Sequence, residues 1–372
     1  RQGLMEAQRF PNDFDGIVAG APAFAYQALN AAGIWNLQRI FRNNLAGNLA
    51  VDTNSDGSFD SLKLIDVLHE QVLGKCDAND GITDGVINNP LACDFDPSRD
   101  LNDLMCPAGT STDECFSEAQ LQTTIDLYTG PVDDDGNSVY PGKALGSEPQ
   151  WARYYVPYNG NNMGPSKLVG VAGDHMNYLF YEQDPGRTIP DVRDYQYQPR
   201  ADGVFPEFHW IDYDINDFYS GKGDLMKAIT DAEDPNLTQF LEDRSGKLIV
   251  YHGWSDTLIV AEDTLDYFND MVNVTFSGSI AAASESARLF LAPGMGHCAG
   301  GPGPNSWDKL APLVDWVENG VAPSSIIATH SSNGSVDNER PICAYPQQAT
   351  YTGPTSGQNN PENWVAENFI CQ

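Results

Sequence analysis

The chain has 372 residues, of which 41% are hydrophobic and 19% are charged, so it can bury a sizeable core and disorder is not expected. Its 52 acidic and 20 basic residues give a formal net charge of −32, and such a surface repels nucleic-acid phosphates and anionic lipid headgroups. No run of about 18 apolar residues occurs, so no membrane-spanning helix is expected. We therefore expect neither a nucleic-acid partner nor a membrane partner.

The first expected element is a helix over residues 2–9, which starts without a capping residue and without a signal-peptide pattern. We therefore expect a further segment of the same protein to precede Arg1. A short apolar run at residues 17–20 predicts a buried strand. Ser61 is the expected N-cap of the next helix, and Gly74 is expected just past its end.

Residues 76–240 differ in character from the segments on either side. They are rich in Gly, Asp and aromatic residues and contain few long apolar runs. One helix is predicted by the capping box that Ser117 and Gln120 form ahead of an apolar stripe. We interpret residues 76–240 as a lid inserted into a domain that is made of residues 1–75 and 241–372.

From about residue 245 the pattern is regular α/β. Apolar runs at residues 247–251 and 287–291 predict buried strands, and helical patterns follow at residues 264–271 and 310–317. This order predicts a right-handed parallel unit. Asp256 follows the first run and His297 follows the second.

The ends of parallel strands converge on one edge of the sheet, about 5 Å apart for neighbouring strands, so these two side chains can meet. An acid followed by a histidine is the chain order of the later part of an α/β-hydrolase, in which the carboxylate orients the imidazole and the imidazole moves a serine proton. A turn-forming Asp256 and a non-catalytic His297 are the alternative. No Gly-x-Ser-x-Gly motif occurs, and Ser255 shares the loop of Asp256, so the residues leave the nucleophile open.

Six of the seven cysteines lie at short separations that favour local disulfides, namely Cys76 with Cys93, Cys106 with Cys115, and Cys343 with Cys371, which leaves Cys298 over. Glycosylation sequons begin at Asn236, Asn273 and Asn333. Together with the acidity, this pattern favours a secreted, extracellular protein. The alternative is a cytosolic protein with seven free thiols.

Residues 76–86 contain three Asp residues separated by Gly-containing turns. Hard oxygen ligands at this density suit Ca²⁺, although the spacing is not that of an EF-hand. A plain Asp-Gly turn without a metal is the alternative interpretation.

Four segments closely resemble the tannase and feruloyl esterase family, and in particular its fungal feruloyl esterase B type. They are residues 1–23 (RQGLMEAQRFPNDFDGIVAGAPA), 252–256 (HGWSD), 294–298 (GMGHC) and 314–320 (VDWVENG). The resemblance covers essentially the whole chain. It implies the C-terminal part of an α/β-hydrolase fold and a serine esterase in which Asp256 orients the imidazole and His297 acts first as base and then as acid.

The resemblance also implies residues and groups that the spacing alone does not give. The nucleophilic serine would lie in a Cys-Ser-x-Gly-Gly element about four residues before Arg1, and Cys298 would pair with the cysteine of that element. The isolated chain would therefore be inactive. A structural calcium ion would be bound by the side chains of Asp77, Asp80 and Asp84 and by the carbonyl oxygens of Ile82 and Val86.

The implied substrate is a small phenolic ester or a plant-polymer ester of a hydroxycinnamic acid. Within the same family, a tannin acyl hydrolase that acts on gallate esters and a hydrolase of terephthalate monoesters are alternatives. From another class, a secreted binding module that is stabilised by calcium and has no catalytic activity remains open.

Overall fold

The structure is a computed structural model, and it describes residues 1–110, 112–159, 165–181, 210, 213–354 and 360–372. Three parallel strands form its main sheet in the order β1 (Gly16–Gly20), β2 (Lys247–Gly253) and β3 (Ala287–Ala292). Gly16 pairs with Lys247, and Leu248 with Ala287, so β2 lies between the other two strands. The predicted parallel α/β unit is therefore confirmed.

Helices cover both faces of this sheet, which explains why its strands are apolar throughout. Helices α1 (Gln2–Arg9) and α9 (Ala261–Phe276) pack on one face, where Leu248 and Val250 point into the largest core cluster. Helix α11 (Ala311–Asn319) packs on the other face, where Ile249 meets Leu313. The short helix α10 (Ile280–Ala283) precedes β3.

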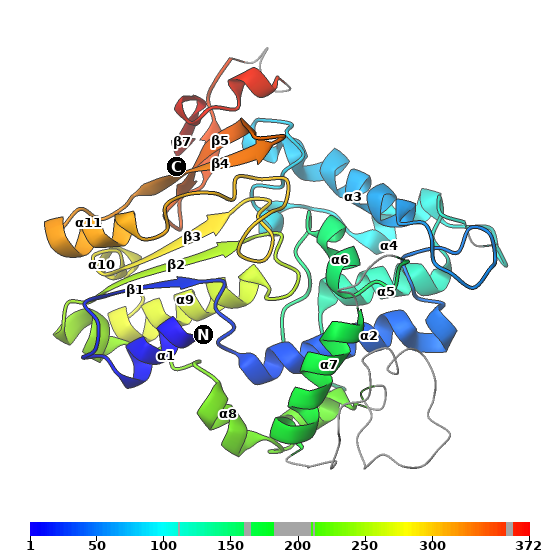
Figure 1. Cartoon of the computed structure of the whole chain (residues 1–372), viewed down its shortest axis with the longest axis horizontal. Coiled ribbons are helices and arrows are strands. Elements are labelled where there is room, and N and C mark those ends of the chain that lie inside the picture. The colour runs from blue at the N-terminus through cyan, green and yellow to red at the C-terminus, as the bar shows by residue number, and fades with distance from the viewer. Residues whose placement is uncertain (111, 160–164, 182–209, 211–212, 355–359) are drawn as a thin grey trace.

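Most of the remaining helices lie beyond the carboxyl ends of the three strands, whereas α8 (Asp224–Thr230) lies below α1 in the view of Figure 1. The others are α2 (Tyr26–Leu45), α3 (Lys63–Cys76), α5 (Glu118–Thr129), α6 (Glu148–Tyr154) and α7 (Pro165–His175), with the one-turn helix α4 (Pro97–Asp100). The predicted capping box is present at the start of α5, between Ser117 and Gln120. Helix α3 runs from Lys63 to Cys76 with Leu62 as its N-cap residue, so the expected N-cap at Ser61 and the expected end before Gly74 are both wrong.

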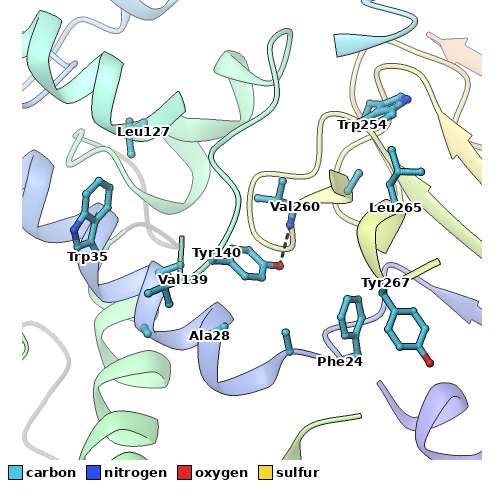
Figure 2. Packing of buried hydrophobic residues seen from close by; sticks show 14 of the residues in the cluster. Phe24, Ala28, Trp35, Leu127, Val139, Tyr140, Trp254, Val260, Leu265 and Tyr267 are labelled. Atoms are coloured by element: carbon cyan, nitrogen blue, oxygen red, sulfur yellow. Dashed lines mark hydrogen bonds between the residues drawn. The ribbon is translucent and has the colours of Figure 1, made fainter. Parts of the chain in front are cut away.

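Two small antiparallel sheets complete the chain: β4 (Ser325–Ser332) with β5 (Ser335–Cys343), and β6 (Ala349–Tyr351) with β7 (Phe369–Cys371). The largest core cluster joins residues from all three parts of the chain, for example Leu4, Trp151 and Leu248. Figure 2 shows Tyr140, from the segment 76–240, between helix α2 and the loop after β2, where its hydroxyl accepts a hydrogen bond from the Val260 N–H at 3.3 Å. The segment 76–240 thus packs directly against the loop that follows the central strand.

Candidate active site

Asp256 lies fully buried in the loop after β2. Its Oδ1 accepts hydrogen bonds from the backbone N–H groups of Leu258 (2.9 Å) and Ile259 (3.0 Å), which fix the carboxylate in place. Burial alone would raise the pKa of this carboxyl group, but hydrogen bonds and charge from two histidines hold it well below its usual range. Asp256 is therefore an ionised, rigidly held carboxylate.

His297 lies in the loop after β3 and meets this carboxylate. Its Nδ1 donates to Oδ2 of Asp256 at 2.8 Å, and 31% of its side chain is exposed. The hydrogen bond to Asp256 raises the pKa of His297, against the effect of partial burial. With Nδ1 protonated and bonded, the neutral imidazole presents the lone pair of Nε2 as a base.

Backbone contacts hold the two loops together. Trp254 N–H donates to the Ala292 carbonyl at 2.9 Å, and Ser255 N–H donates to the Met295 carbonyl at 3.0 Å. A Cβ atom at Gly253 would collide with the Met295 carbonyl oxygen, so this close approach requires glycine. The local sequence at the end of β2 therefore allows the acid and the histidine to meet.

Sequence reasoning assigned no role to His252, which the structure places against the same carboxylate. Its Nε2 lies 2.9 Å from the Ile259 carbonyl and 3.3 Å from Oδ2 of Asp256, and its Nδ1 lies 2.8 Å from the Thr264 hydroxyl. Because a carbonyl only accepts, we assign the proton to Nε2, and Nδ1 then accepts from Thr264. A polar residue inside an otherwise apolar strand, four positions before Asp256, was the signal for this second partner.

Ser255 is turned away from this pair. Its hydroxyl is buried and donates to the Gly146 carbonyl at 3.2 Å. Within the part of the chain that the structure describes, no serine hydroxyl hydrogen-bonds to His297. The nucleophile therefore remains unassigned among these residues.

The N-terminal end of the chain lies on the same side of the sheet as the carboxyl ends of its strands (Figure 1). Burial raises the pKa of the Cys298 thiol, and the Arg1 amino group lies near enough to act against this shift. Cys298 is free among the described cysteines.

The three Asp residues of the expected calcium loop lie beside a buried arginine. Arg340 of β5, itself fully buried, forms ion pairs with Asp80 (3.3 Å) and Asp84 (2.6 Å), while Asp77 accepts from the backbone N–H groups of Asp84 (3.2 Å) and Gly85 (3.0 Å). Burial raises the pKa of Asp80 to about 6.

The net charge of the side chains in and beside this loop is compatible with a bound calcium ion. The loop carries three carboxylates, of which Asp80 and Asp84 pair with the one guanidinium, and the two negative charges in excess of Arg340 match one divalent cation. In the described ranges, however, no three acidic, His or Cys side chains are placed so that they could hold a metal ion as they stand. Ile82 and Val86, the expected carbonyl ligands, are buried in the same loop.

Three disulfides join Cys76 to Cys93, Cys106 to Cys115, and Cys343 to Cys371, the pairs that the short separations favour. The three sequon asparagines, Asn236, Asn273 and Asn333, are all exposed. No helix of the described part of the chain is long and apolar enough to cross a bilayer.

A cavity of about 160 Å³ lies apart from the candidate site. Trp254 lines one wall, with Asn88, Leu291 and Tyr345 among the other lining residues, but neither Asp256 nor His297 reaches it. This cavity is therefore not the space in which the His297 imidazole could act.

Comparison with known proteins shows which family model and which relatives this chain matches. A family model described as "Tannase and feruloyl esterase" matches residues 1–366. The mono(2-hydroxyethyl) terephthalate hydrolase of Piscinibacter sakaiensis is 32% identical over 100% of this chain and 62% of its own length. Feruloyl esterase B of Aspergillus niger is 28% identical over 98% of this chain and 64% of its own.

Solved structures of similar fold cover the whole chain. Feruloyl esterase B from Aspergillus oryzae aligns with a TM-score of 0.74 at 25% identity, over 100% of this chain and 66% of that one. Tannin acyl hydrolase from Aspergillus niger aligns with a TM-score of 0.70 at 22% identity, over 100% and 62%. The expected α/β-hydrolase fold is thereby confirmed. The chain spans less than two thirds of the length of these relatives.

Proposed function

Because the chain belongs to the tannase and feruloyl esterase family, we propose that it is the C-terminal part of a secreted serine esterase that releases hydroxycinnamic acids of the ferulic type from plant-derived esters. The observation that carries this proposal is the 2.8 Å hydrogen bond between His297 and the buried Asp256 at the carboxyl edge of a parallel sheet. The histidine and the acid of a Ser-His-Asp triad have this geometry.

In the proposed reaction a serine that precedes Arg1 is the nucleophile. Nε2 of His297 takes the serine proton as the hydroxyl oxygen attacks the ester carbonyl, and Asp256 stabilises the imidazolium. The imidazolium then gives that proton to the departing alcohol as the ester C–O bond breaks. In the second half of the reaction Nε2 takes a proton from water as the water oxygen attacks the acyl carbonyl, and gives that proton to the serine oxygen as the acyl–enzyme C–O bond breaks and the phenolic acid leaves. Backbone N–H groups of the preceding segment would bind the oxyanion.

Gallate esters and terephthalate monoesters are alternative substrates, since relatives of this chain carry the corresponding names. The discriminating experiment compares kcat/KM of the full-length protein on methyl ferulate, methyl gallate and mono(2-hydroxyethyl) terephthalate. We expect methyl ferulate to be the best of the three, and the 372-residue chain alone to turn over none. Absence of turnover on all three esters by the full-length protein would contradict the esterase assignment.

We also propose that residues 77–86 bind a structural Ca²⁺ through Asp77, Asp80, Asp84 and the carbonyls of Ile82 and Val86. Buried carboxylates in excess of Arg340 support this proposal. When bound, the ion would neutralise this excess charge. Arg340 would balance the third carboxylate and tie the loop to β5.

Calcium should therefore stabilise the fold. At a free concentration 100 times the Kd, a ligand that binds only the native state adds about 2.7 kcal/mol, so chelation by EDTA should lower the Tm by several degrees. Asp84→Asn should abolish the response to calcium, whereas Asp56→Asn, in the exposed turn at residues 52–60, should keep it. Equal Tm values for the unmodified protein in calcium and in EDTA would refute the site.

Secretion and glycosylation complete the proposal. Three disulfides and three exposed sequon asparagines support an extracellular location with glycans at Asn236, Asn273 and Asn333. The remaining cysteine, Cys298, is proposed to pair with a cysteine in the segment before Arg1. The partners are then a phenolic or plant-polymer ester and that segment of the same protein.

A further inference from the structure

Lys143 is a buried lysine in the middle of the insertion, between helices α5 and α6. Only 4% of the residue is exposed. Its Nζ donates to the Thr257 carbonyl at 2.6 Å and to the Tyr155 hydroxyl at 2.9 Å. Across the described residues no carboxylate forms an ion pair with it, so its partners are a backbone carbonyl and a phenol.

The carbonyl that Lys143 contacts belongs to the residue directly after Asp256. Tyr155 donates its own hydroxyl proton to the same Thr257 oxygen at 3.1 Å, so the three polar groups form a closed triangle. The ammonium also lies 4.4 Å from the centroid of the Tyr155 ring, within the range of a cation–π contact. The insertion therefore holds the acid loop by a pair of donors that converge on one oxygen.

Packing alone does not account for a charged group at this place. Removing an ammonium from water costs several kcal/mol, and lysine is almost never fully buried without a partner. A methionine would fill a similar volume without this cost. Burial lowers the pKa of Lys143 to about 7, and the charge of Asp256 opposes the shift, so the carboxylate lies near enough to attract the ammonium.

The neighbouring contacts show what the loop would lose without this lysine. The backbone N–H groups of residues 258 and 259 orient Oδ1 of Asp256, but both belong to the loop itself. From the insertion, Tyr140 contacts the loop further along, at Val260. Among the residues of the insertion that the structure describes, Lys143 and Tyr155 are thus the side-chain donors next to Asp256.

We propose that Lys143 is a positioning residue of the esterase. By donating a hydrogen bond to the Thr257 carbonyl, it keeps the Asp256 carboxylate within hydrogen-bond distance of His297. The proposal rests on the esterase function proposed above, and it gives the 76–240 insertion a part in the chemistry. The insertion would then do more than cover the site, because its own folding would set the geometry of the catalytic acid.

The test is Lys143→Met in the full-length protein, with Lys222→Met as the matched control. Lys222 also belongs to the insertion and also lies over a tyrosine ring, that of Tyr181, but it is half exposed and pairs with Asp217. A misplacement of about 1 Å can cost roughly 100-fold in rate. We therefore expect Lys143→Met to lower kcat by 10- to 100-fold with little change in KM, and Lys222→Met to match the unmodified protein.

A second readout does not depend on activity. The Nδ1 proton that His297 shares with Asp256 should give a low-field proton NMR signal, assigned by its loss in His297→Ala. Lys143→Met should weaken this signal, and Lys222→Met should retain it. If the unmodified protein hydrolyses no phenolic ester, the proposed function fails, while the NMR comparison still decides the role of Lys143.

An unchanged kcat and an unchanged low-field signal in a folded Lys143→Met protein would overturn the inference. A lowered Tm with both readouts unchanged would do the same, because it would show a structural role only. If Lys143→Met does not fold, Tyr155→Phe decides, since it removes the other donor to the Thr257 carbonyl. We expect that variant to lower kcat at constant KM, and an unaltered kcat would overturn the proposal.

Discussion

Replacement of His297 by alanine in the full-length protein should lower kcat/KM for ester hydrolysis by about 10⁴- to 10⁶-fold, the usual cost of removing a triad histidine. Among the described residues, His297 is the only partly exposed imidazole that pairs with Asp256, since the second histidine on this carboxylate, His252, is fully buried. Without it the serine proton has no acceptor and the alcohol has no donor. Initial rates on methyl ferulate measure the effect.

The chain provides a matched control for this variant. His330 and Asp337 form a second His–Asp pair, with Nδ1 and Oδ1 2.6 Å apart, in the hairpin of β4 and β5. His330→Ala removes the same chemical group from a pair that lies outside the candidate site, so its kcat/KM should equal that of the unmodified protein. A His297→Ala protein that is folded and retains more than about a tenth of the activity would disprove the assigned base.

Replacement of Asp256 by asparagine should cost about 10⁴-fold in kcat. The neutral amide cannot stabilise the imidazolium, and its NH₂ group favours the wrong tautomer of His297. The variant also removes the charged acceptor beside His252. Asp337→Asn, in the surface pair, is the matched control and should leave the rate unchanged.

The pH dependence of kcat/KM gives a second test of Asp256→Asn, for which the direction of the change is predicted. The hydrogen bond to Asp256 raises the pKa of His297 above its ordinary value near 6.5, and a general base must be deprotonated. In the unmodified enzyme kcat/KM should therefore fall as the pH drops through a value above 6.5. Removing the carboxylate lowers that pKa, so the acid limb of the variant should move to lower pH. A shift in the opposite direction would contradict the pairing.

The free energy of unfolding should also depend on pH through the pKa of Asp256. The pKa of Asp256 is depressed in the folded state, so its contribution to stability is present above the ordinary Asp value near 4 and is lost as the pH falls through the folded value. The difference in unfolding free energy between the unmodified protein and Asp256→Asn should therefore shrink in acid. Denaturant unfolding at several pH values measures it.

Helix α2 is an element that the sequence pattern does not reveal. Residues 26–45 form a 20-residue helix that the sequence analysis did not predict. Most of its side chains are buried, on more than one face, because helices α5, α7 and α8 pack against it. A helix that is covered on several sides has no polar stripe, so the 3.6-residue periodicity that reveals a half-exposed helix is absent.

The sequence alone determined the features that depend on neighbours along the chain. Two apolar runs that each end in a polar loop predicted the parallel strands and the pair of Asp256 and His297, and short cysteine separations predicted three disulfide pairs. The tertiary structure alone decided which charged groups became buried beside them. His252, at the end of β2, reaches Asp256 from four positions away, but Lys143 reaches Thr257 from 114 residues away, and Arg340 reaches Asp80 from 260 residues away. Whether a charged side chain is buried depends on which distant segments pack around it. Local residue patterns do not predict that packing.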